Sequence, residues 1–242
     1  MKFSHVLALA TAASAFPALQ ESNTDLEVRD IEARQRGRGG RGGAGGGGNV
    51  GSTANEFVEG GCKDVIMIFA RGSTERGNMG TICGPQTANG VKAQFSSVAV
   101  QGVDYAAGLA TNTLPGGADP KGIDEMKRLI AKANTECPNS MLVVGGYSQG
   151  AAVTHRAVES LPQAQQDQIV AAFMFGDTQF QQEGGEIANF DNSKTNIICA
   201  QGDAVCRGSL TILPAHLSYG NRAAEQADFI NQKLTAAGAR RK

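Results

Sequence analysis

One serine in this sequence is placed for nucleophilic chemistry. Ser148 lies in a G-x-S-x-G pattern, Gly146-Tyr147-Ser148-Gln149-Gly150, between a short apolar run and a stretch with helical periodicity. In a strand–turn–helix setting this pattern forms a nucleophile elbow, a strained turn that lifts the serine hydroxyl above the end of a parallel sheet. Glycines flank the turn because side chains there would collide with the nearby helix backbone. The pattern therefore predicts a catalytic serine rather than an ordinary surface turn.

A serine hydroxyl needs a general base, and the chain contains three histidines. His5 belongs to an N-terminal targeting segment described below. His155 lies seven residues past Ser148 on the same expected helix, about 10 Å along its axis, which is too far for a hydrogen bond. We therefore predict that His216 is the base, and we interpret His155 as a partly exposed helix residue.

A carboxylate must orient the imidazole, and in this type of fold it lies between the serine and the histidine in chain order. Asp203 is the preferred candidate because it follows an apolar strand and lies inside the short ring that Cys199 and Cys206 could close. Asp177 also follows a strand and is the second candidate, although a turn or cap role is favoured for it.

Attack by a serine on a carbonyl carbon creates an oxyanion, which needs hydrogen-bond donors. The backbone N–H of Gln149, the residue after the nucleophile, is one expected donor. Ser73 is expected to supply the other, from the polar loop that follows the first predicted strand. The alternative is that this loop is an ordinary polar turn. This chemistry needs no metal and no cofactor, and we expect neither.

The elements that must position these residues alternate along the chain. Apolar runs predict strands near 64–70, 96–103, 141–145, 169–175 and 195–200, and helices are expected at 85–95, from 120 onward, at 151–158 and at 221–237. This order favours an α/β fold whose parallel sheet has helices on both faces. Ligands bind at the carboxyl ends of such strands, where the candidate residues lie.

The start of the chain does not have the pattern of a folded domain. Residues 1–15 have the basic start, apolar run and A-x-A site of a cleaved secretory signal peptide, which is too short to span a membrane. Residues 16–34 are expected to be a pro-segment, and 35–54 a flexible Gly/Arg-rich segment. A single domain is expected at 55–238, followed by a frayed basic tail at 239–242.

The distribution of charge argues against a nucleic-acid partner. The chain has 22 basic and 23 acidic residues, but outside the signal, pro-segment, Gly-rich run and tail there remain 13 basic and 18 acidic residues. An acidic domain is not a nucleic-acid surface, and the Arg-Gly run at 36–43 is brief. With no later stretch apolar and long enough to span a bilayer, we expect a secreted, extracellular protein.

The five cysteines of a secreted chain are disulfide candidates rather than metal ligands. Cys199 and Cys206 could close a tight ring. Cys62 and Cys137 each precede a strand, so neighbouring strands could bring them together, and that bridge would contribute about 4 kcal/mol. Cys83 is left over, either as a buried thiol or as half of an intermolecular bridge.

Four segments together resemble the fungal cutinase family. They are Ala70-Arg-Gly-Ser-Thr-Glu75, Gly145-Gly-Tyr-Ser-Gln-Gly150, Cys199-Ala-Gln-Gly-Asp-Ala-Val-Cys206 and Pro214-Ala-His-Leu-Ser-Tyr219. The resemblance implies a small α/β-hydrolase without a lid and with a central five-stranded parallel sheet. It also implies the disulfides Cys62–Cys137 and Cys199–Cys206, the catalytic residues Ser148, Asp203 and His216, and an oxyanion hole at Ser73 and Gln149. Cys83 departs from the family pattern.

The same resemblance implies a substrate class, namely cutin, the hydroxy-fatty-acid polyester of plant surfaces, together with short-chain esters. Two apolar loops would bind the substrate, one around Leu114 and one containing Ile212, Leu213 and Leu217. A monomer is expected. An acetylxylan esterase on the same fold is the alternative, but a chain with no Trp and three Tyr is poor in sugar platforms. A non-catalytic effector is disfavoured because every catalytic residue is present.

Overall fold

A computed structural model describes residues 49–242, all of which belong to one compact unit of the chain. The expected signal peptide, the pro-segment and most of the Gly/Arg-rich segment lie outside the described residues. Within residues 49–242 no helix is both long enough and apolar enough to cross a bilayer.

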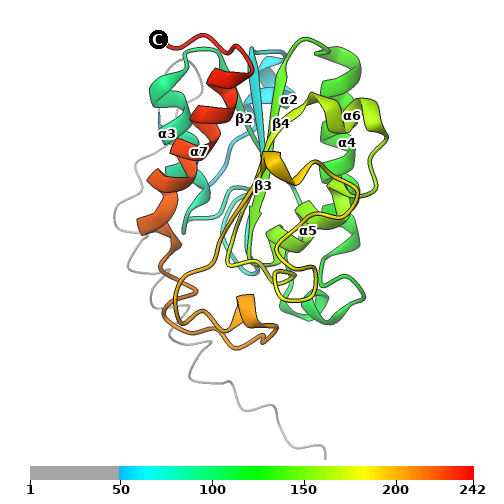
Figure 1. The fold of residues 1–242 in the computed structure, drawn as a ribbon, viewed down its shortest axis with the longest axis vertical. Coiled ribbons are helices and arrows are strands. Elements are labelled where there is room, and N and C mark those ends of the chain that lie inside the picture. Colours follow the sequence, from blue (N-terminus) through cyan, green and yellow to red (C-terminus); the bar gives the residue numbers. More distant parts are fainter. Residues whose placement is uncertain (1–48) are drawn as a thin grey trace, which may run out of the picture. The chain divides into compact units, whose positions relative to one another are not determined.

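A parallel sheet of five strands lies at the centre of this unit (Figure 1). The strands are β1 (Val65–Ala70), β2 (Val98–Gly102), β3 (Met141–Tyr147), β4 (Ile169–Phe175) and β5 (Thr195–Ile198), in the order β2-β1-β3-β4-β5. Strand β1 is buried along its whole length, as a continuous apolar run requires when helices cover both faces. The predicted α/β class and parallel sheet are confirmed.

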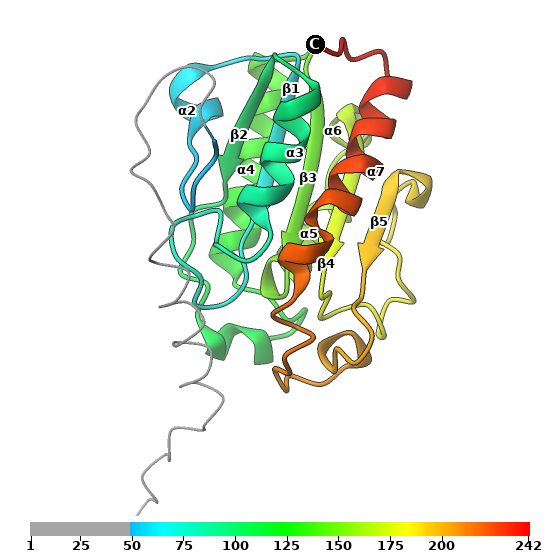
Figure 2. The same ribbon diagram turned by 90° about the vertical axis from the view of Figure 1, so that its left-hand side faces the viewer.

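Helices cover both faces of the sheet (Figures 1 and 2). On one face lie α3 (Gly84–Gln94) and α7 (Ala223–Ala236); on the other lie α4 (Pro120–Glu136), α5 (Gln149–Val158), α6 (Gln163–Gln168) and the short α2 (Glu56–Gly60). Helix α4 begins as expected, because Asp119 accepts a hydrogen bond from the Lys121 N–H and Pro120 occupies the first turn.

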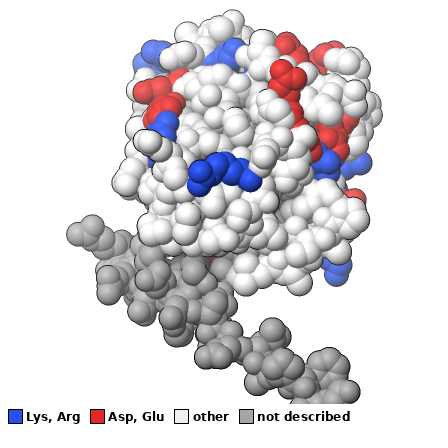
Figure 3. All heavy atoms as spheres, turned by 60° about the horizontal axis from the view of Figure 1, so that its bottom comes forward, with Lys and Arg blue, Asp and Glu red and all other residues white. Residues whose placement is uncertain are grey.

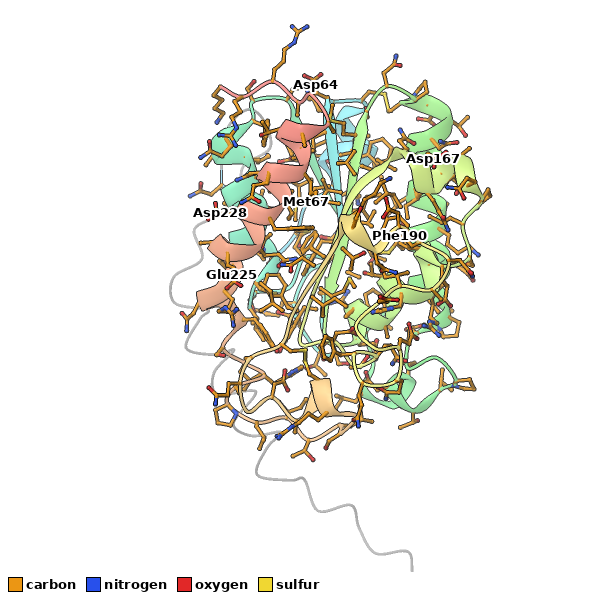
Figure 4. All side chains as sticks on the ribbon, viewed as in Figure 1. Asp64, Met67, Asp167, Phe190, Glu225 and Asp228 are labelled. Atoms are coloured by element: carbon orange, nitrogen blue, oxygen red, sulfur yellow. A yellow bond between two sulfur atoms is a disulfide. The ribbon has the colours of Figure 1, made fainter. Side chains whose placement is uncertain are left out.

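Alternating side chains of the sheet form two apolar clusters. Ile66 and Ile68 of β1 pack toward α4 and α5, whereas Met67 and Phe69 pack toward α3 and α7. Met67 and Phe190, labelled in Figure 4, belong to opposite clusters. Because both faces of the sheet are buried, the register of each strand against its neighbours is fixed. The position of every loop at the strand ends is therefore fixed as well.

Packing begins before the expected domain start at residue 55. Val50 and Ala54 are buried, although both fall in the stretch expected to be flexible. The Val50 N–H donates to the side chain of Asn89, and the Ala54 N–H donates to that of Asn78. Side chains distant in sequence therefore hold this segment, and its own composition gives no sign of them.

The basic tail is likewise attached, which corrects the expectation that it is frayed. Arg241 forms a β-bridge with Phe95, and the Lys242 N–H donates to the Gln94 carbonyl at 2.9 Å. These bonds fasten the end of the chain to the end of α3.

Both implied disulfides are formed. Cys62–Cys137 and Cys199–Cys206 have Cα–Cα distances of 5.5 and 6.1 Å. Cys83 is buried without a disulfide partner, which agrees with the thiol alternative. Burial raises the pKa of its thiol, and the nearby Glu75 raises it further, so the group stays protonated and unreactive.

Among residues 49–242, four short 3-10 segments complete the loops. They are η2 (Leu109–Thr113), η3 (Asn192–Lys194), η4 (Val205–Arg207) and η5 (Tyr219–Arg222). Segment η2 precedes Leu114, and it lies with η4 at the carboxyl end of the sheet, the lower end in Figure 1.

Candidate active site

Ser148 forms the sharp turn between β3 and α5. Its φ is 55°, a left-handed value that is costly for a residue with a side chain. The flanking glycines are required by the space available. A Cβ on Gly146 would lie 2.0 Å from the Gly150 carbonyl oxygen, and one on Gly150 would lie 2.0 Å from that of Ala70. The turn has the geometry expected of a nucleophile elbow.

Ser148, His216 and Asp203 form a continuous hydrogen-bonded chain. His216 Nε2 lies 2.9 Å from Ser148 Oγ, and His216 Nδ1 lies 2.8 Å from Asp203 Oδ2. With the proton on Nδ1 donated to Asp203, the Nε2 lone pair faces the serine hydroxyl and can accept its proton. All three side chains are buried. The structure thus brings together the three residues selected from the sequence.

Asp203 is held from several sides. It lies in the disulfide ring of residues 199–206, its Oδ1 accepts the Val205 N–H, and its Oδ2 accepts the Tyr219 hydroxyl at 2.6 Å. Burial by itself would raise the pKa of the Asp203 carboxyl. The hydrogen bonds from His216, Tyr219 and Val205 outweigh burial and lower that pKa below its usual value. Asp203 is therefore ionised when His216 must accept a proton.

The two expected oxyanion residues, Ser73 and Gln149, are both hydrogen-bonded to η2 or to the residue that precedes it. Asn112 of η2 donates a hydrogen bond to Ser73 Oγ at 2.9 Å, and Gln149 Nε2 donates to the Gly108 carbonyl at 2.8 Å. Because the Ser73 oxygen accepts from Asn112, its own proton is left for a ligand. The sequence reasoning missed Asn112, since no motif marks it and its contact spans 39 residues.

Glu75 supports the loop that carries Ser73. Its carboxylate accepts the backbone N–H groups of Gly72, Thr81 and Ile82 at 2.8 to 2.9 Å. Arg71 donates through Nε to the Glu75 carbonyl at 2.8 Å. These hydrogen bonds hold the backbone of the loop that carries Ser73 in one conformation. The sequence shows a glutamate at position 75, but it does not show which three backbone N–H groups donate to its carboxylate.

The mouth of the site is apolar. Leu114 and Leu213 are 41% and 37% exposed, and Ile212 and Leu217 are partly exposed beside His216. Leu109 and Leu210, which the sequence reasoning did not select, are also exposed in the same two loops. The part of this end that Figure 3 displays carries few charged side chains. An exposed apolar surface of this kind fits a ligand with an acyl chain.

The interpretation of His155 as partly exposed is wrong. Its side chain is fully buried, with Nε2 2.9 Å from Asp177 and Nδ1 2.8 Å from Glu183. Asp177 also accepts the Gln179 N–H, so its turn role is confirmed, and it is bound to His155 rather than to His216. Both carboxylates come from chain beyond β4, which explains why the helix pattern alone did not indicate burial.

The chain is similar to known proteins over most of its length. A family model described as Cutinase matches residues 61–234. The chain is 51% identical over 187 residues to "Cutinase CUT2" of Pyricularia oryzae, covering 76% of this chain and 87% of the relative. It is 39% identical over 236 residues to "Cutinase 1" of Fusarium vanettenii, covering 94% of each.

Solved structures give the same result. The Trichoderma reesei cutinase in complex with a C11Y4 phosphonate inhibitor matches with a TM-score of 0.68 and 29% identity, covering 88% of this chain and 93% of that one. An acetylxylan esterase matches with a TM-score of 0.56 and 19% identity, covering 72% and 99%. At that identity the second likeness is one of fold alone.

Proposed function

The chain belongs to the cutinase family of carboxylic ester hydrolases, and from this premise we propose that it cleaves cutin and short-chain fatty acid esters with a Ser148–His216–Asp203 triad. The observation that carries the proposal is the unbroken chain of hydrogen bonds from Ser148 Oγ through His216 to Asp203. A serine, a base and an orienting acid in this geometry are what acyl transfer through a serine requires.

The reaction would run in two halves. His216 Nε2 takes the Ser148 proton while Oγ attacks the ester carbonyl, and the resulting oxyanion accepts hydrogen bonds from the Gln149 N–H and from Ser73. The imidazolium, stabilised by Asp203, then gives its proton to the departing alcohol and leaves an acyl-enzyme. Water attacks that ester by the same route, with His216 again acting first as base and then as acid.

The apolar mouth supports a polyester as substrate. A solid polymer cannot enter a closed pocket, so the ester must reach Ser148 at an open surface. Leu114 and Leu213 stand exposed on the two loops beside the site, where a fatty acyl segment could lie between them. Removing such apolar side chains from water on binding contributes roughly 25 cal/mol per Å².

Acetylxylan esterase activity is the competing proposal, since such an enzyme shares the fold. A polysaccharide site would favour aromatic platforms and polar loops. The chain has no Trp, and exposed leucines occupy the loops beside the triad. We therefore favour the acyl polyester.

Secretion and processing are part of the proposal. We propose that residues 1–15 are removed as a signal peptide, that residues 16–34 form a pro-segment, and that the mature enzyme acts outside the cell as a monomer. Two disulfides support an oxidising location, because such bonds persist outside the reducing cytosol.

The test is release of hydroxy fatty acids from purified cutin by the processed enzyme, beside acetate release from acetylated xylan. Ser148→Ala is the blank, and Ser160→Ala is the matched control, because the Ser160 hydroxyl donates to the Arg156 and Ala157 carbonyls at the end of α5. We expect wild type and Ser160→Ala to release hydroxy fatty acids from cutin, and Ser148→Ala to release none. If acetate were released from xylan and nothing from cutin, the substrate would be a polysaccharide. If Ser148→Ala turned over substrate at the wild-type rate, the assignment of Ser148 as nucleophile would be wrong.

A further inference from the structure

Tyr219 contacts the carboxylate oxygen on which the triad depends. Its hydroxyl lies 2.6 Å from Asp203 Oδ2, the same oxygen that lies 2.8 Å from His216 Nδ1. One carboxylate oxygen therefore receives two hydrogen bonds, one from the base and one from a tyrosine that takes no part in the reaction described above.

The direction of the tyrosine hydrogen bond is fixed by a second contact. The Ala200 N–H donates to the Tyr219 hydroxyl oxygen at 2.9 Å. A backbone N–H can only donate, so the single proton of the Tyr219 hydroxyl is left for Asp203. Ala200 lies in the disulfide ring that also holds Asp203, which ties the hydroxyl to the same small unit.

The ring of Tyr219 is packed tightly, so it cannot move its hydroxyl toward a different hydrogen-bond partner. Its side chain is fully buried and packs against Phe175, Tyr147 and the His216 imidazole, with ring centroids 5.7, 5.8 and 6.0 Å away. A Cβ added to Gly176 would lie 2.7 Å from the Tyr219 ring, so the backbone of that turn closes the remaining side. The hydroxyl is held at one point relative to Asp203.

We propose that Tyr219 is a positioning residue for ester hydrolysis, which holds Asp203 in the orientation that faces His216 and reduces the negative charge that Asp203 presents to the imidazolium. The inference rests on the proposed triad and adds Tyr219 to it as a fourth residue. A purely structural role is the alternative, in which only the packing of the aromatic ring matters.

The charges around the hydroxyl agree with a neutral donor. Burial raises the pKa of Tyr219, and the bond to Asp203 raises it further, so the hydroxyl keeps its proton throughout the working range. The titratable groups in contact with Tyr219 are Asp203, His216 and Tyr147, and the Cys83 thiol is also close enough to act on its pKa. Burial raises the pKa of both Tyr147 and Cys83, so neither carries charge there. Asp203 is thus the only anion that the Tyr219 hydroxyl contacts among the described hydrogen bonds.

Tyr219→Phe removes the hydroxyl and keeps the ring. Hydrolysis of a soluble short-chain ester should lose about tenfold in kcat with little change in KM, as expected when a hydrogen bond to a charged group is lost. Without the tyrosine proton Asp203 attracts the imidazolium more strongly. The midpoint of the acid limb of kcat/KM should therefore move to higher pH, by about half a unit to one unit. An unchanged acid limb would overturn the proposal.

Two further variants separate this inference from the proposed triad. Tyr105→Phe removes another buried hydroxyl, one that donates to the Arg71 carbonyl, and should leave the acid limb in place. In an Asp203→Asn background, Tyr219→Phe should change kcat less than about twofold, because residues that act through one another are not additive. Wild-type kcat in Asp203→Asn would refute the triad itself, whereas a damaged Asp203→Asn with an unaffected Tyr219→Phe would refute only the role of Tyr219.

A second measurement does not depend on Tyr219→Phe folding. Placing 3-fluorotyrosine at position 219 makes the hydroxyl a stronger donor with almost no change of shape. The acid limb should then move to lower pH, opposite to its shift in Tyr219→Phe. A limb that stays in place would overturn the proposal even if the phenylalanine variant proved unstable.

Discussion

At the scale of single residues, the site depends on groups that orient other groups. Ser148 holds a left-handed backbone conformation, and Asn112 donates a hydrogen bond that orients the Ser73 hydroxyl. Each reacting atom is thus placed by a neighbour that does not react. Such preorganised donors contribute to catalysis because they need no rearrangement as charge develops.

Asn112 provides the residue-scale prediction. Asn112→Ala should lower kcat for a soluble ester by about tenfold with KM nearly unchanged, since the Ser73 hydroxyl loses the bond that orients it toward the transition state. Asn112→Asp keeps the shape but cannot donate, and should be equally impaired. Asn134→Ala removes an amide that donates between α4 and α6, and serves as the matched control. Full activity in Asn112→Asp would mean that donation to Ser73 is unimportant.

At the scale of elements, the two disulfides constrain very different lengths of chain. Cys62–Cys137 spans 75 positions and joins the segment before β1 to the end of α4, whereas Cys199–Cys206 spans 7 positions and encloses Asp203. Stabilisation by a cross-link grows with the loop that it closes, while control of a catalytic side chain depends on proximity. The two bonds should therefore affect different properties.

Paired serine variants measure this difference. Replacing Cys62 and Cys137 should lower the free energy of unfolding by about 4 kcal/mol, and replacing Cys199 and Cys206 by about 2.5 kcal/mol. Only the second pair should markedly lower kcat at a temperature where both variants are folded, because only that ring holds Asp203. Urea unfolding and ester kinetics would be compared on the same samples. Equal losses of kcat in both variants would contradict the assignment.

At the scale of the whole molecule, stability in acid should depend on Asp203. Because its folded pKa lies below the unfolded value of about 3.9, its contribution is complete above that value and disappears as pH falls through the folded pKa. The unfolding free energy of wild type minus that of Asp203→Asn should thus shrink as pH falls below about 4 and through the lowered pKa of Asp203. A difference that stays constant over this range would show that the carboxylate gains nothing from its bonds in the fold.

Across the whole molecule, features set by local sequence were predictable, whereas contacts between distant segments were not. Local pattern determines a strand, a turn or a helix, so the sheet and the Ser148 elbow were predictable. Elimination among the three histidines indicated His216, and chain order together with the Cys199–Cys206 ring indicated Asp203. The partners of Asn112, Tyr219 and His155 come from distant segments that only the folded chain brings together, and no local pattern marks such contacts. The attached tail escaped prediction for the same reason.

The parallel sheet also separates the two ends of the domain. All five strands run toward the triad, while Asp64, at the start of β1, and the C-terminus lie at the opposite end (Figures 1 and 4). A carrier protein or a solid support joined at Lys242 would therefore lie at the end of the domain opposite the triad. An immobilised form would present its leucine-bearing end, which carries few charges, outward toward a polymer film.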